Sequence, residues 1–340
     1  MSLAAFLKKL NNKESLSAGE TQLAFDVIFE GKAEESELGA FLLALHEKGE
    51  TADDIRGAVT SMRAKAITIV APANAIDIVG TGGDARGTLN ISTAASLVTA
   101  ACGLPVAKHG NRAATSKSGS SDVLSALGIN LEPTLSALET CLHEAHLCFL
   151  FAPRHHPAMR HVAAIRKKLG IRTIFNLLGP LTNPANVKKH LIGVYAKELM
   201  QPMADVLRSL GSDAAWLTHG RDGMDELTTM ATTDVLQLSF PEGAVSTIVR
   251  PEDFGLRKPE LHELQGGDAA YNATALRNLL AGHKNAYRDI VALNAAAALV
   301  VGGKAIDIRE GLLRATESLD SGAAHDTLQK LIDITNRVSS

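Results

Sequence analysis

Residues 75–103 read AIDIVGTGGDARGTLNISTAASLVTAACG. The first five letters form a short apolar run that predicts a buried strand, and the last eleven have the apolar spacing of a helix. The loop between them holds four glycines at positions 80–87. Glycine lets a backbone adopt positive φ and lets its N–H groups approach a ligand closely. A strand, a glycine-rich loop and a helix in this order predict part of a parallel α/β sheet.

The same alternation continues on both sides of this stretch. Further strands are predicted at PVAKHG, LCFLFAP, HLIGVYA and AAWLTHG, and helices at SSDVLSALG, HPAMRHVAAIRKKLG and through most of the last 70 residues. Ligands of such sheets bind beyond the carboxyl ends of the strands. The first 66 residues predict four helices, with a capping box at Ser17 and Glu20 and a new helix opening at Thr51. The predicted fold class is therefore α/β, with a small all-helical N-terminal domain and a larger domain built on a mostly parallel sheet flanked by helices.

Composition limits the function classes. The formal net charge of −3 gives no general electrostatic basis for binding nucleic acid. No apolar run approaches the roughly 20 residues of a membrane span, and the charged start does not resemble a signal peptide. The three cysteines form no CxxC pair, so we interpret them as reduced core residues. A cytoplasmic protein with small-molecule partners is expected.

Three loops that follow predicted strands are rich in ligand-binding residue types. After the first strand, GTGGD leads to Asn90, Ser92 and Thr93 at a helix start, where free N–H groups favour an anion. The alternative is a purely structural turn, because the loop is neither a Walker A loop nor GxGxxG. The second loop, KHGNRAATSKSGSS, carries Lys108, Arg112 and Lys117 among small residues, and its alternative is a solvated charged segment.

The third loop, HGRDGMDELT, places Asp225 beside Glu226. Adjacent carboxylates repel one another, and a bound hard cation offsets that cost, so the pair predicts Mg²⁺ held together with ligand phosphates. The alternative is an acidic turn in which Glu226 caps a helix. Around a predicted helix end, one of the arginines Arg166 and Arg172 could grip a substrate carboxylate, whereas Lys167 and Lys168 are expected on an exposed face.

Two clusters resemble metal sites but lack the expected companions. The run PRHHPAMRH has no HExxH motif and no cysteine partner, and the cysteines and histidines at 141–148 follow the spacing of an amphipathic helix running into an apolar strand. We predict no zinc in either. The residues concerned are His155, His156 and His161 in the first cluster, and Cys141, His143, His146 and Cys148 in the second.

With these motifs collected, the chain resembles the anthranilate phosphoribosyltransferase family of tryptophan biosynthesis. The resemblance covers nearly the whole length through GAFLLALHEKGET, GTGGD, NIST, KHGNRA, SGSSDVL, HHPAM, RKKLGIRTIFNLLGPLTNPA and GRDGMDE in order. It implies transfer of a 5-phosphoribosyl group from phosphoribosyl pyrophosphate to the amine of anthranilate, with two Mg²⁺ ions per site. It also implies a homodimer formed through the helical domain.

The resemblance implies residue roles as well. The phosphoribosyl pyrophosphate set would be Gly80, Thr81, Gly82, Gly83, Asp84, Thr88, Asn90, Ser92, Thr93, Lys108 and Ser120. The anthranilate set would be Gly80, His109, Asn111, His156, Arg166 and Pro180. The metal ligands would be Ser92, Asp225 and Glu226. No general base is assigned, and one departure from the family pattern is Ala85, where glycine is common and which bears on loop flexibility.

The domain organisation implied by the resemblance is discontinuous. Residues 1–70 with 157–185 would form the helical domain, and 71–156 with 186–340 the α/β domain, with closure between them. Two rival functions stay open at this point. A pyrimidine nucleoside phosphorylase would need a different phosphate-binding set, and a silent relative that binds nucleic acid would need a basic groove.

Overall fold

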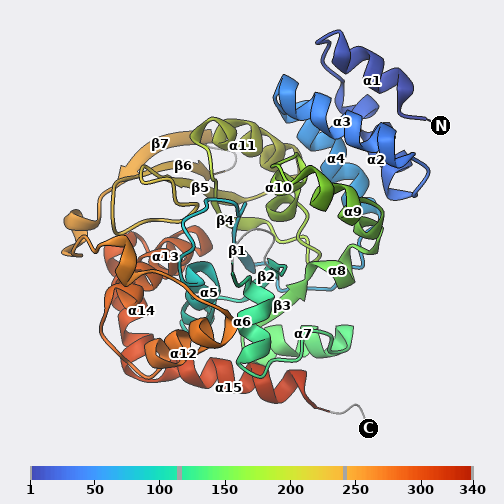
Figure 1. Cartoon of the computed structure of the whole chain (residues 1–340). Helices are drawn as coiled ribbons and strands as arrows, with labels where there is room; N and C mark the ends of the chain where they lie inside the picture. Colours follow the sequence, from blue (N-terminus) through green and yellow to red (C-terminus); the bar gives the residue numbers. More distant parts are fainter. Residues whose placement is uncertain (1, 113–116, 240–242, 338–340) are drawn as a thin grey trace.

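The computed structural model describes residues 2–112, 117–239 and 243–337 (Figure 1). Seven strands form one sheet in the order β3-β2-β1-β4-β5-β6-β7. The first five are parallel, and β6 and β7 run antiparallel at one edge. The strands are β1 (Ile76–Gly80), β2 (Val106–Gly110), β3 (Leu147–Phe151), β4 (Lys189–Gly193), β5 (Ala214–Gly220), β6 (Thr233–Ser239) and β7 (Gly243–Val249).

The strand order reverses at β1. From β1 the chain first builds outward to β2 and β3, and then returns to add β4 and β5 on the other side. The loops that leave β1 and β4 therefore diverge, which opens a crevice at the carboxyl ends of these two strands. This topology puts the predicted glycine-rich loop at the crevice.

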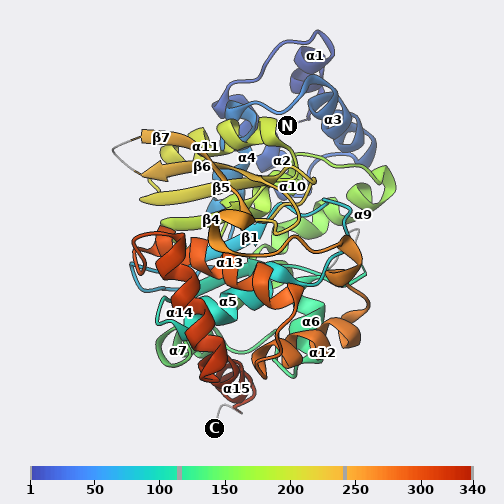
Figure 2. The same cartoon turned by 90° about the vertical axis from the view of Figure 1, so that its left-hand side faces the viewer.

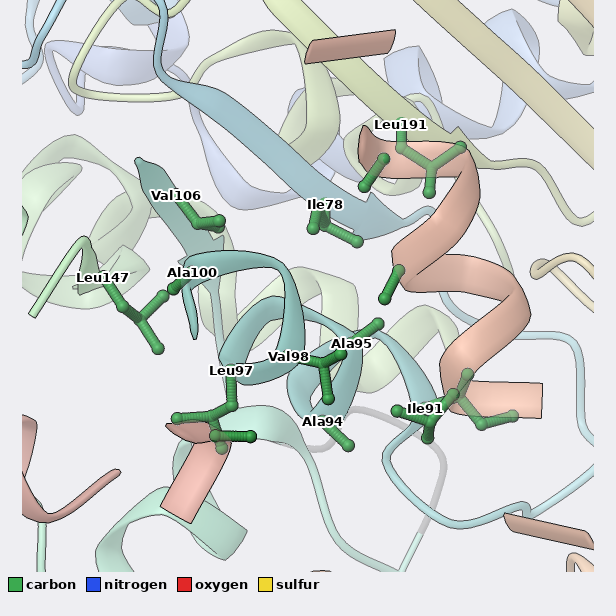
Figure 3. Close-up of a cluster of buried hydrophobic side chains, with 14 of the residues drawn as sticks. Ile78, Ile91, Ala94, Ala95, Leu97, Val98, Ala100, Val106, Leu147 and Leu191 are labelled. Carbon is green, nitrogen blue, oxygen red and sulfur yellow. The ribbon is translucent and has the colours of Figure 1, made fainter. Parts of the chain in front are cut away.

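One face of the sheet is covered by the helices of the larger domain (Figure 2). Figure 3 shows Ile91, Ala95 and Val98 of α5 with Ile78 and Leu191 of the sheet in one buried cluster. Alanine lets helices approach a sheet closely, and these side chains are almost wholly shielded from solvent. The helices on this side are α5 (Ile91–Ala101), α6 (Ser120–Ala126), α7 (Leu135–Glu144), α12 (Ala269–Leu280), α13 (Ala286–Gly302), α14 (Ile308–Asp320) and α15 (Ala323–Thr335).

The other face packs against the helical part of the chain (Figure 2). Leu191 belongs to the first core and Ile192 to the second, because successive strand residues point to opposite faces. Both α2 and α3 contact α9, and α4 contacts α10 and α11, so residues far apart in the sequence share this core. The helices here are α1 (Ala4–Asn11), α2 (Ala18–Phe29), α3 (Glu35–Lys48), α4 (Ala52–Ala64), α8 (Ala152–His155), α9 (Arg160–Leu169), α10 (Phe175–Leu178) and α11 (Met200–Ser209).

The local predictions are largely confirmed. Four helices form in the first 66 residues, and the capping box of Ser17 and Glu20 is present at the start of α2. A second box joins Thr51 and Asp54 at the start of α4. The hairpin of β6 and β7 was not predicted, because both strands interleave apolar with polar residues instead of forming a continuous apolar run, and β6 is held by pairing with β5. Within the described ranges, no helix has both the length and the apolar character that crossing a membrane requires.

Candidate active site

A cavity of about 820 Å³ opens at the carboxyl ends of the central strands. Loops after β1 and β2 form one side, and α9 with α10 forms the other. Every residue singled out for phosphoribosyl pyrophosphate, anthranilate or metal lines this single cavity. They are Gly80, Thr81, Gly82, Gly83, Asp84, Thr88, Asn90, Ser92, Thr93, Lys108, His109, Asn111, Ser120, His156, Arg166, Pro180, Asp225 and Glu226.

The glycine-rich loop needs its glycines for two different reasons. Gly82 and Gly83 have φ of +69° and +80°, which side chains disfavour. At Gly80 the reason is space, since a Cβ there would lie 2.5 Å from Oδ2 of Asp225. Ala85, at the position where glycine is common in the family, also adopts a positive φ of 58°. Ala85 therefore keeps the left-handed backbone conformation that glycine would adopt, and its Cβ makes that conformation energetically costly.

Lys108 lies inside β2, as the predicted strand PVAKHG had it, and not in the loop KHGNRAATSKSGSS to which the sequence analysis also assigned it. The side chain is only 3% exposed, and its Nζ donates to the Ile78 carbonyl at 2.6 Å and to the Ser92 hydroxyl at 3.3 Å. Burial lowers the pKa of Lys108, while the nearby carboxylates of Asp77 and Glu226 raise it. A cation thus lies at the floor of the cavity beside the start of α5.

The paired carboxylates face this cation from the loop after β5. Asp225 is buried, and burial together with Asp84 and Glu226 raises its pKa well above the ordinary value. Burial also raises the pKa of Glu226 to about 7, although Lys108 opposes the shift. No helix follows this turn. Glu226 accepts from the Ser92 N–H in the first turn of α5 at 3.2 Å, so it does cap a helix, although one that lies far away in the sequence.

The donor set fits a hard divalent cation. Carboxylate and hydroxyl oxygens of Asp84, Asp225, Glu226 and Ser92 line the cavity, and these are the ligands that Mg²⁺ prefers. Within residues 2–112, 117–239 and 243–337, no three acidic, histidine or cysteine side chains converge as a complete metal site. Oxygens from a bound phosphate would therefore have to complete the coordination, as is usual for Mg²⁺.

The opposite side of the cavity is apolar and carries neutral histidines. His109 and His156 are buried with ring centroids 5.1 Å apart. Burial lowers the pKa of His109 to about 4 and that of His156 to about 3. Nδ1 of His109 lies 2.9 Å from the Gly179 carbonyl, which can only accept, so Nδ1 carries the proton. Pro180 follows in the short 3₁₀ helix Gly179–Leu181.

The guanidinium of Arg166 lies at this side of the cavity, and Arg160 of the same helix also lines it. Arg166 of α9 lies over the Phe175 ring at 5.3 Å and lines the cavity. Lys167 and Lys168 are exposed, as predicted, and Lys168 pairs with Glu35. Arg166 is therefore the basic residue of this helix end that reaches the cavity.

Comparisons with known proteins agree with this geometry. Residues 4–66 match the helical bundle domain of a glycosyl transferase family, and residues 72–325 match its a/b domain. An anthranilate phosphoribosyltransferase of Methylocella silvestris is 54% identical over 98% of this chain and 95% of its own length. The enzyme of Azospirillum brasilense is also 54% identical, over 98% of this chain and 93% of its own. The chain belongs to the anthranilate phosphoribosyltransferase family.

Solved structures extend the likeness to three dimensions. The anthranilate phosphoribosyltransferase of Thermus thermophilus has a TM-score of 0.90 and 39% identity, covering 97% of this chain and 99% of its own. The Saccharomyces cerevisiae enzyme in complex with PRPP and Mg has a TM-score of 0.90 and 31% identity, covering 99% and 98%. These neighbours confirm the fold class of a helical domain joined to an α/β domain.

Several contacts in this phosphoribosyltransferase were missed from sequence. Asp77, in the middle of the apolar run AIDIV, is fully buried and accepts from Asn183 Nδ2 at 2.7 Å and from the His109 N–H at 3.1 Å. Burial raises its pKa to about 6. A carboxylate within a buried strand was the available signal. Arg172 donates to the Gly83 carbonyl and lies over the Tyr195 ring at 4.4 Å.

A second missed group comes from the segment before α12. Gln265 Nε2 donates to the Gly87 carbonyl at 2.6 Å, and Asn272 Nδ2 donates to Asn90 Oδ1 at 2.9 Å. Both side chains line the cavity. The signal was QGGDAAYN, in which two glycines and a helix cap again stand before a helix.

The two clusters that resemble metal sites have other surroundings. Nδ1 of His155 lies 2.6 Å from the Ile67 carbonyl, and His161 is exposed on α9. Cys141 and Cys148 are fully buried in the core, as predicted, whereas His143 and His146 are exposed. Cys102 is only half-buried, which departs from the core role predicted for it, and all three cysteines are free.

Proposed function

We propose that this chain carries out its family's reaction at the cavity described above. The 5-phosphoribosyl group of phosphoribosyl pyrophosphate is transferred to the amine of anthranilate, which gives N-(5-phosphoribosyl)anthranilate and pyrophosphate in tryptophan biosynthesis. The observation that carries the proposal is one cavity with an anion-binding side and a more apolar side at which Arg166 lies over the Phe175 ring. Yeast relatives are described in complexes with PRPP and Mg and with 4-fluoroanthranilate.

On the phosphate side, the reaction needs electrostatic stabilisation. The bond from ribose C1 to the diphosphate oxygen breaks, and the amine nitrogen bonds to C1, so negative charge builds on the leaving group. Lys108 and the amides at the start of α5 face that charge. Ser92, Asp225 and Glu226 are the proposed ligands of two Mg²⁺ ions. Bound Mg²⁺ would neutralise the diphosphate as it departs.

On the aromatic side, the reaction needs positioning. Arg166 is proposed to hold the anthranilate carboxylate through two parallel hydrogen bonds, and Asn111 to contact the same substrate. His109, His156 and Pro180 would line the path of the ring. The low pKa values of both histidines keep this path uncharged at neutral pH. The amine loses a proton after attack, and no side chain is assigned as its acceptor.

The proposal extends to domain movement, oligomeric state and location. Residues 1–70 with 157–185 would move as one unit against the rest and bring Arg166 toward the diphosphate. Leu23 of α2 and Leu43 of α3 are 49% and 37% exposed, and they support a homodimer through the helical domain. Three free cysteines agree with a cytoplasmic location, because oxidising compartments favour disulfides.

The test is a transfer assay. Purified protein with Mg²⁺, phosphoribosyl pyrophosphate and anthranilate is expected to consume anthranilate, measured as loss of its fluorescence. Omitting either phosphoribosyl pyrophosphate or Mg²⁺ should abolish the loss. Unchanged fluorescence across a range of pH and metal concentration would refute the proposed function.

A further inference from the structure

Asn90 occupies a helix-capping position without capping its helix. It is the N-cap residue of α5, where an asparagine side chain usually accepts a hydrogen bond from an N–H of the first turn. Here the side chain makes no such bond. Its Oδ1 accepts from Asn272 at 2.9 Å, and its Nδ2 donates to the Ser118 carbonyl at 3.3 Å. Both ends of the carboxamide are thus engaged away from the helix.

The direction of these bonds is fixed by backbone groups. The Gly267 N–H, which can only donate, bonds to Oδ1 of Asn272 at 2.8 Å. Nδ2 of Asn272 must then face Asn90 and donate to it. At the far end, the Ser118 carbonyl can only accept. These hydrogen bonds run from Gly267 through Asn272 and Asn90 to Ser118. All of them can form only when both side-chain amides have this one orientation.

Asn272 reaches this place from a distant part of the sequence. It lies on α12, is 2% exposed, and lines the cavity although 182 positions separate it from Asn90. The segment before α12 runs along the glycine-rich loop, with the Leu89 N–H donating to Leu264 at 2.9 Å and the Gly266 N–H to Gly87 at 2.8 Å. A Cβ on Gly266 would lie 2.5 Å from the Thr88 carbonyl, so the two backbones are in direct contact.

We propose that Asn272 is a positioning residue of the phosphoribosyl pyrophosphate site. It holds the Asn90 carboxamide away from the start of α5, so that this side chain does not compete with a phosphate for first-turn amides other than that of Ser92, which donates to Glu226. This inference rests on the proposed function, because Asn90 is assigned there to phosphoribosyl pyrophosphate. Its consequence is selective: loss of the Asn272 amide lowers the affinity for phosphoribosyl pyrophosphate and leaves the affinity for anthranilate unchanged.

The test is Asn272→Asp, which keeps the shape of the side chain. An ionised aspartate can still accept from the Gly267 N–H but cannot donate to Asn90, so the hydrogen bond to Asn90 Oδ1 is lost. We expect the Kd for phosphoribosyl pyrophosphate with Mg²⁺, measured by calorimetry, to rise about 10-fold, as for loss of one buried hydrogen bond. The KM for anthranilate should stay within about twofold. Asn278→Asp, exposed on the same helix, is the matched control and should change neither value.

A second variant, Asn272→Ala, removes the amide without adding charge and should raise the Kd for phosphoribosyl pyrophosphate in the same way. Unchanged Kd values, or equal increases for both substrates, would overturn the proposal. Failure of both variants to fold would also overturn it, because Asn272 would then support the fold and not the site. Binding is measured without turnover, so an inactive wild type that still binds phosphoribosyl pyrophosphate would refute the transfer reaction and leave this test intact.

Discussion

The two sides of the cavity differ in their electrostatic character. The phosphate side gathers a buried lysine, helix amides and three carboxylates around the glycine-rich loop. The aromatic side has neutral histidines, a proline and one guanidinium over a phenyl ring. The first arrangement suits a highly charged ligand that arrives with its own cations, and the second suits a flat ring with a single carboxylate. A protein can therefore bring two unlike substrates together by concentrating most of the charged groups on one side of the cavity.

The comparison fails if the carboxylates of the phosphate side do not act through a metal. Asp225→Asn with Glu226→Gln should lower kcat by about 10³-fold, because the departing diphosphate loses its stabilising charge. Initial rates measured against Mg²⁺ concentration check this: the wild type is expected to saturate with Mg²⁺, and the double variant is expected not to. The pair Glu144→Gln with Glu317→Gln, exposed on α7 and α14, serves as the control. Full activity of the active-site double variant would place the metal elsewhere.

The aromatic side is tested by Arg166→Ala. Loss of a charged hydrogen-bond donor is expected to raise the KM for anthranilate by about 10- to 100-fold. The KM for phosphoribosyl pyrophosphate should change by less than about twofold, since Arg166 contacts the other substrate in the proposal. Steady-state kinetics with each substrate varied in turn provide the measurement. Lys167→Ala, the exposed neighbour, should behave like the wild type, and equal effects on both KM values would contradict the division.

The neutral histidines make the aromatic side sensitive to acid. The folded pKa of His156 is about 3, below that of an unfolded chain, so the unfolded state binds more protons as pH falls from about 6.5. The free energy of unfolding should then fall by at most about 1.4 kcal/mol per pH unit for this residue between pH 6 and 4. Urea titrations of the wild type and of His156→Gln measure the difference in slope. Parallel slopes would mean that His156 titrates normally, and His143→Gln, on the exposed face of α7, should leave the slope unchanged.

The smallest change concerns the backbone of the phosphate side. Ala85→Gly removes the strain of a positive φ but increases the freedom of the unfolded chain. The two effects nearly cancel, so thermal unfolding should show a gain of less than about 1 kcal/mol, with both KM values within about twofold. Ala40→Gly, exposed within α3, should instead cost about 1 kcal/mol. A loss at position 85 as large as that at position 40 would show that the left-handed conformation carries no cost.

Much of the fold followed from local pattern. The helix boundaries at Ser17 and Thr51 were predictable because a capping box satisfies backbone groups within four residues. The parallel strands were predictable because each is a short apolar run that ends in a loop. The β6 and β7 hairpin was not, since its strands mix apolar with polar residues and β6 pairs with the edge of β5.

The candidate site divides in the same way. Residue type and position after a predicted element were enough to identify the glycine-rich loop, the adjacent acids Asp225 and Glu226, and Arg166. The roles of Asp77 and Asn272 do not, because their partners Asn183 and Asn90 lie 106 and 182 positions away. Lys108 was found, but the sequence analysis assigned it both to the strand PVAKHG and to the loop after it, and only the structure places it within β2.

By itself, the sequence determined which segments become helices and strands and which loops carry ligand-binding chemistry. Hydrophobic periodicity, glycine conformation and helix capping each depend on residues a few positions apart, so they can be recognised from a short stretch of sequence. Only the tertiary structure decided that Glu226 meets the first turn of α5, that Lys108 lies beneath both, and that Asn272 directs Asn90. Those contacts exist because the sheet reverses its order at β1 and brings distant loops to one edge, and strand order is a property of the whole chain's packing.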